Sequence, residues 1–133
     1  MHLPERLIMM EINISPKMEP ARTHMIFIVV PRFNITTLIT MIETIRIANY
    51  LVATPIFSWE VASFDGEKVT ASNGMTTTVA VANDSLPTAE FVFILGSWGT
   101  EYYTNRHLTA WLRKRARAGE RVCGVELGCY IIA

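Results

Sequence analysis

The segment from Met25 to Val30 reads M-I-F-I-V-V, and it indicates the fold more clearly than any other stretch of the sequence. It is a continuous apolar run rich in β-branched residues, and Pro31 ends it. A strand that is covered on both faces needs apolar side chains on both sides. The segment is therefore predicted to be a central strand of a parallel sheet.

Other strands follow along the chain. Phe91 to Leu95 (F-V-F-I-L) repeats the apolar pattern and ends at Gly96, and Val122 to Val125 predicts a third, shorter buried strand. Phe57 to Phe64 is extended in pattern as well. The turn dipeptides D-G at 65–66 and N-G at 73–74 bound Lys68 to Ser72 and Met75 to Val81, which predicts a hairpin with partly exposed, Thr-rich strands.

Two helices are predicted between these strands. The first begins at Ile35 with Asn34 as its cap, and the second spans Arg106 to Ala118 and stops at Gly119. Their predicted faces follow helical spacing. They are Ile35, Leu38, Ile39, Ile42, Arg46 and Asn49 in the first helix, widened by Met41, Ile45 and Ala48, and Leu108, Trp111, Leu112 and Arg115 on the inner side of the second.

This order of elements predicts an α/β fold, a doubly wound and mostly parallel sheet with flanking helices. Ligands of such sheets bind beyond the carboxyl ends of the strands. The expected site therefore lies where residues 31–34, 96–100 and 126–128 follow their strands.

Length, net charge and cysteine content limit the classes of protein to which the chain can belong. The 133 residues fit one domain, and twelve basic residues balance twelve acidic ones, so no overall field attracts nucleic acid or an anionic membrane. Cys123 and Cys129 have no partner at metal-ligand spacing and are expected to be free thiols in a reducing cytoplasm. Residues 1 to 23 carry three prolines and several charges, which predicts a loosely ordered leader without a signal peptide. No membrane span, metal or cofactor is expected.

Four segments follow one another in an order typical of one family. They are P-R-F-N (31–34) with E-T-I-R-I-A-N (43–49); W-E-V-A-S-F-D-G (59–66) with S-N-G (72–74); F-V-F-I-L-G (91–96); and A-W-L-R (110–113) leading to G-V-E-L-G-C-Y-I-I-A (124–133). On these segments, Ile26 to Ala133 resembles the PfpI/ThiJ-like, class I glutamine amidotransferase-like N-terminal domain of AraC-type transcriptional regulators.

The resemblance carries expectations about organisation and role. Residues 24–133 would form a flavodoxin-like PfpI domain that stops after the strand-to-helix elbow, with a DNA-binding helix-turn-helix domain expected downstream. The function implied is a non-catalytic, ligand-sensing and dimerisation domain of a transcriptional regulator, acting as a homodimer. DNA would be contacted only through the downstream domain.

The enzymes of this superfamily carry a cysteine at the elbow and an acidic residue early in the first helix. Glu126 and Thr37 stand at the matching positions here, and the histidines, His2, His24 and His107, lie elsewhere in the sequence. The resemblance therefore implies a degenerate nucleophile position. The alternatives are a PfpI-like hydrolase or amidase that uses Glu126 or Cys129, and an interaction protein without a ligand. Cys129 and Cys123 are expected to pack in the core.

The predicted ligand site comprises residues at the strand ends: Glu126, Trp98, Ser97, Gly96, Phe33 and Asn34. Glu126 either caps the helix that follows it or faces a cationic or hydrogen-bond-donating ligand, and Trp98 either packs its loop or offers an aromatic face to a cation. The resemblance implies a small nitrogenous effector, of the choline-derived or carnitine-like kind.

Two groups of charges need a separate interpretation. The second helix region is basic, which indicates either a solvated helix face or phosphate contacts; its members are Arg106, Arg113, Lys114, Arg115, Arg117 and Arg121. Glu43 and Arg46, three residues apart, predict a structural ion pair.

Overall fold

The computed structural model describes residues 22–133. Almost all of the predicted leader, residues 1–23, lies outside this range. The elements in chain order are β1 (Thr23–Val29), α2 (Ile35–Leu51), β2 (Phe57–Ser63), β3 (Val69–Thr70), β4 (Thr76–Thr77), β5 (Ala80–Val81), β6 (Phe91–Gly96), the 3-10 turn η1 (Thr100–Tyr102), α3 (Arg106–Arg117), β7 (Arg121–Glu126) and α4 (Cys129–Ile132). Every buried strand and long helix predicted from the sequence is present.

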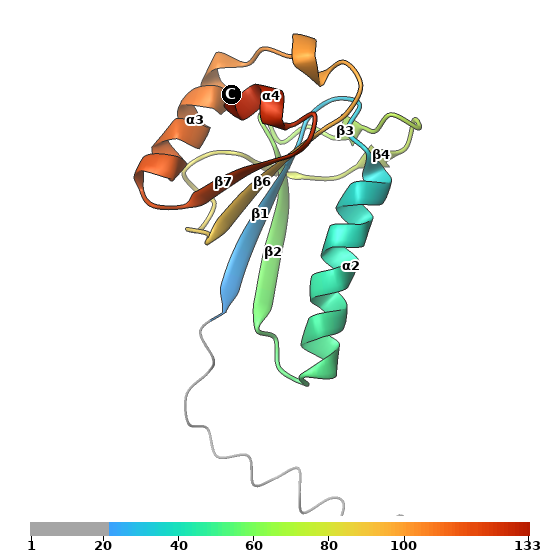
Figure 1. Cartoon of the computed structure of the whole chain (residues 1–133), viewed down its shortest axis with the longest axis vertical. Helices are drawn as coiled ribbons and strands as arrows, with labels where there is room; N and C mark the ends of the chain where they lie inside the picture. Colours follow the sequence, from blue (N-terminus) through green and yellow to red (C-terminus); the bar gives the residue numbers. More distant parts are fainter. Residues whose placement is uncertain (1–21) are drawn as a thin grey trace, which may run out of the picture.

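A five-stranded sheet in the order β5-β2-β1-β6-β7 forms the centre of the molecule, and all of its neighbouring strands run parallel (Figure 1). β1 occupies the middle position, as the M-I-F-I-V-V segment predicts. The doubly wound, mostly parallel sheet is therefore confirmed. Its carboxyl ends gather the loop after β1, the turn after β2, the loop after β6 and the turn after β7 at one edge.

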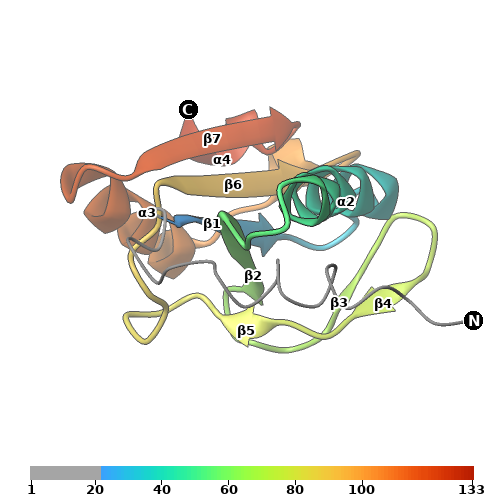
Figure 2. The ribbon, with the colours of Figure 1, turned by 90° about the horizontal axis from the view of Figure 1, so that it is seen from below.

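The two long helices cover opposite faces of this sheet (Figure 2). Side chains alternate along each strand, so Ile26 and Ile28 of β1 pack toward Leu108 and Trp111 of α3. Phe27 and Val29, between them, belong to the second core cluster, together with Phe33, Ile35 and Leu38 at the start of α2. All four inner residues predicted for α3 are buried.

The predicted inner face of α2 is only partly correct. Ile35 and Leu38 are buried, but Ile39 is 50% exposed and Arg46 lies on the outside, where it pairs with Glu43 at 2.6 Å. The pairing holds the pKa of the Glu43 carboxyl below its ordinary value. The helix carries apolar residues nearly all the way round, so spacing alone did not single out one face. The Asn34 cap is confirmed, because its side chain accepts from the Thr36 amide at 3.0 Å.

The predicted hairpin is confirmed for its first part and wrong for its end. β3 and β4 pair antiparallel, as the N-G turn predicts. Ala80 and Val81, predicted to continue the hairpin, instead form β5 and pair parallel with Ala62 and Ser63 of β2. The chain returns to the main sheet there because the free edge of β2 offers unpaired backbone groups.

Arg115 and Lys114 of the basic helix region each pair with an acidic residue. Arg115 is buried and donates to Glu120 Oε1 at 3.0 Å and to the Pro87 carbonyl at 2.9 Å, while Glu120 also accepts from the Ala89 amide at 2.6 Å. This clamp ties the end of α3 to the loop before β6. Lys114 pairs with the exposed Asp84 at 2.6 Å.

Within residues 22–133 no helix is both long and apolar enough to cross a bilayer. The same residues contain no group of three His, Cys, Asp or Glu side chains that could hold a metal ion.

Candidate functional site

The turn from β7 into α4 forms an elbow with the sequence G-V-E-L-G, residues 124–128. Gly124 and Gly128 allow the chain to turn this tightly. A Cβ on Gly124 would lie 2.5 Å from the Cα of Cys129, and one on Gly128 would overlap the carbonyl oxygen of Ile94. Between them, Glu126 has a φ of 50°, a left-handed conformation that costs a residue with a side chain about 1 to 2 kcal/mol. The elbow therefore carries glutamate at its apex, at the position that the resemblance implies.

The Glu126 carboxylate is held by the first turn of α2. Asn34 Nδ2 donates to Glu126 Oε1 at 3.2 Å, and the Thr37 hydroxyl donates a short hydrogen bond to the same oxygen. Thr37 therefore lies beside the elbow, where the resemblance places the acidic partner of the enzymes. Oε2 accepts no hydrogen bond from the residues that the structure describes. The exposed carboxylate thus keeps one oxygen open to solvent.

The interpretation that Glu126 caps its own helix is wrong. α4 begins at Cys129 with Gly128 as its N-cap, and no side chain supplies a capping hydrogen bond. The Glu126 carboxylate instead accepts hydrogen bonds from Asn34 and Thr37 at the start of α2.

The other predicted site residues separate into two groups. Gly96 lies directly beside Glu126 in the β6–β7 register, and Trp98, two residues further on, is 75% exposed. The Trp98 ring makes no stacking or cation–π contact among residues 22–133. Ser97 is buried, and Phe33 is fully buried in the core under α2, so the ring of Phe33 packs the interior rather than lining an open surface. Burying the apolar ring of Phe33 removes it from water, which is why the ring packs in the core and not at the surface beyond the strand ends.

The prediction that Cys129 is buried is wrong, since its side chain is exposed. The first turn of α4 presents Gly128 and Ile131 to the protein, and Ile131 packs against the core cluster below α3. Cys129 therefore faces outward. Cys123 is half-buried within β7.

Neither described histidine lies in position to assist the elbow. His24 Nδ1 bonds to Ser58 Oγ at 2.8 Å near the start of β1, the end of the sheet away from Glu126. His107 stacks on Phe64 with ring centroids 5.8 Å apart. His2 lies outside the described residues.

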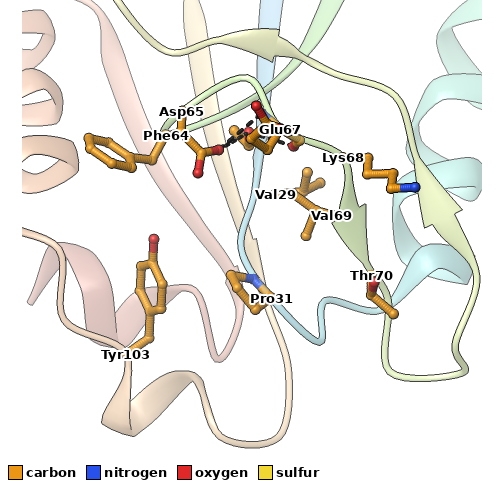
Figure 3. A pocket seen from close by; sticks show the side chains of 10 residues that line it. Val29, Pro31, Phe64, Asp65, Glu67, Lys68, Val69, Thr70 and Tyr103 are labelled. Carbon is orange, nitrogen blue, oxygen red and sulfur yellow. Dashed lines mark hydrogen bonds between the residues drawn. The ribbon is translucent and has the colours of Figure 1, made fainter.

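A cavity of about 290 Å³ opens between the loop after β1, the segment joining β2 to β3, and Tyr103 after η1 (Figure 3). Its walls include Pro31, Phe64, Asp65, Val69 and Tyr103. Sequence reasoning missed this cavity because the D-G turn was interpreted only as a hairpin boundary. The rule that sites form at strand ends applies equally to β2, whose carboxyl end leads directly to Asp65.

The parallel sheet, the opposed helices and the glycine-flanked elbow define a ThiJ/PfpI-type fold. A ThiJ/PfpI domain protein from Brachyspira murdochii superposes with a TM-score of 0.64 over 86% of this chain and 64% of that one, at 12% identity. An AraC family transcriptional regulator from Pseudomonas putida gives a TM-score of 0.69 over 77% of this chain and 55% of that one, at 20% identity.

The sequence of the chain is also similar to those of two transcriptional regulators. It is 29% identical over 107 residues to the HTH-type transcriptional regulator GbdR, and 30% identical over 107 residues to the HTH-type transcriptional regulator CdhR, both of Pseudomonas aeruginosa. These alignments cover 80% of this chain but only 29% and 32% of the two regulators. No family model matches the chain. The predicted resemblance to a PfpI/ThiJ-like domain of AraC-type regulators is confirmed.

The left-handed backbone at Glu126 gives a direct prediction. Glu126→Gly and Glu126→Ala both remove the carboxylate and its hydrogen bonds, but only glycine adopts a φ of 50° without strain. We expect the glycine variant to be more stable than the alanine variant by about 1 kcal/mol in urea unfolding. Equal stability of the two variants would mean that the elbow is not strained at this residue.

Proposed function

We propose that this chain is the effector-sensing part of a DNA-binding transcriptional regulator, and that it has no catalytic activity of its own. The observation that carries the proposal is the elbow of the ThiJ/PfpI-type fold with Glu126 at its apex, held by Asn34 and Thr37. The similarity to two HTH-type transcriptional regulators supports the regulatory role.

Chemistry at the elbow argues against catalysis. An activated nucleophile needs a neighbouring base or a lowered pKa, and the base is in turn oriented by a third group. The partners of Glu126 are an amide and a hydroxyl, which hold a carboxylate in place but accept no proton from a nucleophile at neutral pH. The arrangement suits a fixed anionic binding group.

The effector that suits this group is a small nitrogenous compound, either cationic or rich in N–H donors. Glu126 Oε2 is open to such a ligand. Trp98 lies on the loop that follows Gly96, the residue paired with Glu126, and its exposed indole offers the face that attracts an organic cation. Together they favour a trimethylammonium compound or a related amine.

Homodimerisation and DNA binding belong to the same proposal. By analogy with the two regulators, DNA contact would be made by a helix-turn-helix domain, and residues 22–133 would supply the effector response. Sedimentation velocity of the chain at micromolar concentration tests the dimer directly.

A thermal-shift screen tests the effector site. Ligands that bind only the native state raise the unfolding midpoint with concentration, so trimethylammonium compounds, amino acids and amides are titrated against the chain and against Glu126→Gln. We expect a trimethylammonium compound to raise the midpoint of the wild-type chain and to lose this effect in the variant. Glu101→Gln, on the nearby η1, is the control for loss of a carboxylate and should retain the shift.

The absence of any shift in a folded chain would overturn the effector proposal and favour an interaction role. A shift that persists unchanged in Glu126→Gln would leave a ligand-binding domain but remove the elbow carboxylate from its site.

The exposure of Cys129 favours a second candidate, a PfpI-like hydrolase or amidase that uses this thiol. We expect no hydrolysis of p-nitrophenyl esters or anilides above that of a Cys129→Ser variant. Turnover that alkylation with iodoacetamide and Cys129→Ser both abolish would establish the enzyme instead.

A further inference from the structure

The cavity beside β2 combines an apolar floor with a few polar groups, as small-molecule sites do. Val29, Pro31 and Val69 supply the floor, and the Phe64 ring stands at one side (Figure 3). Glu126 does not line it. The cavity is therefore a separate feature from the elbow carboxylate.

Asp65 supplies a carboxylate whose position is fixed by the turn after β2. Its Oδ1 accepts from Ser63 Oγ at 3.2 Å and from the Glu67 amide at 3.0 Å. Oδ2 accepts no hydrogen bond from residues 22–133. One oxygen thus anchors the turn, and the other remains available to a donor in the cavity.

Tyr103 supplies a hydroxyl that can donate. Figure 3 shows this hydroxyl pointing into the cavity on the side of Phe64 and Asp65. It accepts from Asn105 Nδ2 at 3.3 Å, and its own hydrogen has no acceptor in the described part of the chain. Burial raises the pKa of the Tyr103 phenol above its ordinary value of 10.0, the Asn105 hydrogen bond acts in the opposite direction, and the negative charge of Asp65 raises it further. The phenol is therefore protonated and ready to donate at neutral pH.

Two further charged residues line the cavity, Lys68 and Glu67. The Lys68 ammonium points away from Phe64 and Tyr103 in Figure 3. Glu67 also lines the cavity and adds a second negative charge. The cavity as a whole favours a positively charged occupant.

We propose that this cavity is a binding site for a small organic amine in its protonated form that also carries an oxygen acceptor, such as an amino alcohol. The ammonium donates to Asp65 Oδ2, and the ligand oxygen accepts from the Tyr103 hydroxyl. The site requires N–H donors, so it discriminates against a quaternary ammonium. The proposal is independent of the effector site at Glu126.

The test follows backbone amide shifts by NMR during titration with 4-amino-1-butanol at neutral pH and millimolar concentration. The neutral 1,4-butanediol and the N-trimethyl derivative of the amine serve as matched probes. We expect saturable shifts centred on Gly66, Glu67 and Tyr103 with the amine, and weaker or no binding of the other two. Asp65→Asn, which keeps the Oδ1 acceptor of the turn, should weaken binding at least about tenfold, and Tyr103→Phe about threefold to tenfold.

Asp84→Asn, the same change of charge at an exposed residue outside the cavity, should bind as the wild-type chain does. The proposal is overturned if no probe shifts the cavity amides, if the N-trimethyl derivative binds as well as the amine, or if Asp65→Asn and Tyr103→Phe both retain wild-type affinity. Shifts that Glu126→Gln abolishes would place the amine at the elbow, which overturns the cavity site and leaves the effector proposal standing.

Discussion

Gly128→Ala is expected to destabilise the chain by about 3 kcal/mol, because the added methyl group would overlap the carbonyl oxygen of Ile94. Ile94 is fully buried in β6, and its strand is paired on both sides by β1 and β7. The carbonyl therefore cannot move aside without disturbing three strands. Urea unfolding followed by circular dichroism measures the loss, which is a large fraction of the 5 to 15 kcal/mol typical of a domain.

Gly119→Ala is the matched control for this prediction. Gly119 has a φ of 95°, but a Cβ there would meet nothing within 4 Å. Its replacement introduces only backbone strain, and the expected cost is about 1 to 2 kcal/mol. If Gly128→Ala proved no more costly than Gly119→Ala, the close approach of the elbow to β6 would be wrong.

Arg115→Met is expected to cost about 3 to 5 kcal/mol, since it leaves the Glu120 carboxylate buried without its cation. The side chains of Arg115 and Glu120 are only 10% and 6% exposed. The change also removes the hydrogen bond to the Pro87 carbonyl and the contact of the guanidinium with the Trp111 ring, whose centroid is 4.7 Å away. The same unfolding measurement checks the value.

The neighbouring ion pair supplies the control. Lys114 and Asp84 are 66% and 71% exposed, so water already solvates both charges and Lys114→Met should cost less than about 1 kcal/mol. A double-mutant cycle of Arg115→Met with Glu120→Gln should show strong coupling. Similar losses from Arg115→Met and Lys114→Met would contradict the clamp.

The strand predictions are confirmed because the pattern that predicts a strand lies within the strand itself. An apolar run such as F-V-F-I-L predicts a buried strand without reference to the rest of the chain. The N-G turn and the Asn34 cap likewise depend on residues only a few positions apart. The predictions that failed depended on what surrounds an element. Ile39 and Cys129 are exposed, and residues 80–81 left the hairpin, because the neighbouring sheet and helices decide which face is covered.

The sequence by itself determined the α/β class and the central position of the M-I-F-I-V-V strand, since short apolar runs fix the local backbone. The family resemblance implied the elbow with a glutamate at its apex. Only the tertiary structure decided the contacts of that glutamate. Thr37 and Glu126 are 89 positions apart and meet because the carboxyl end of β7 and the first turn of α2 lie at one edge of the sheet. The cavity between Asp65 and Tyr103 has the same origin, because no local pattern records which loops a parallel sheet brings together.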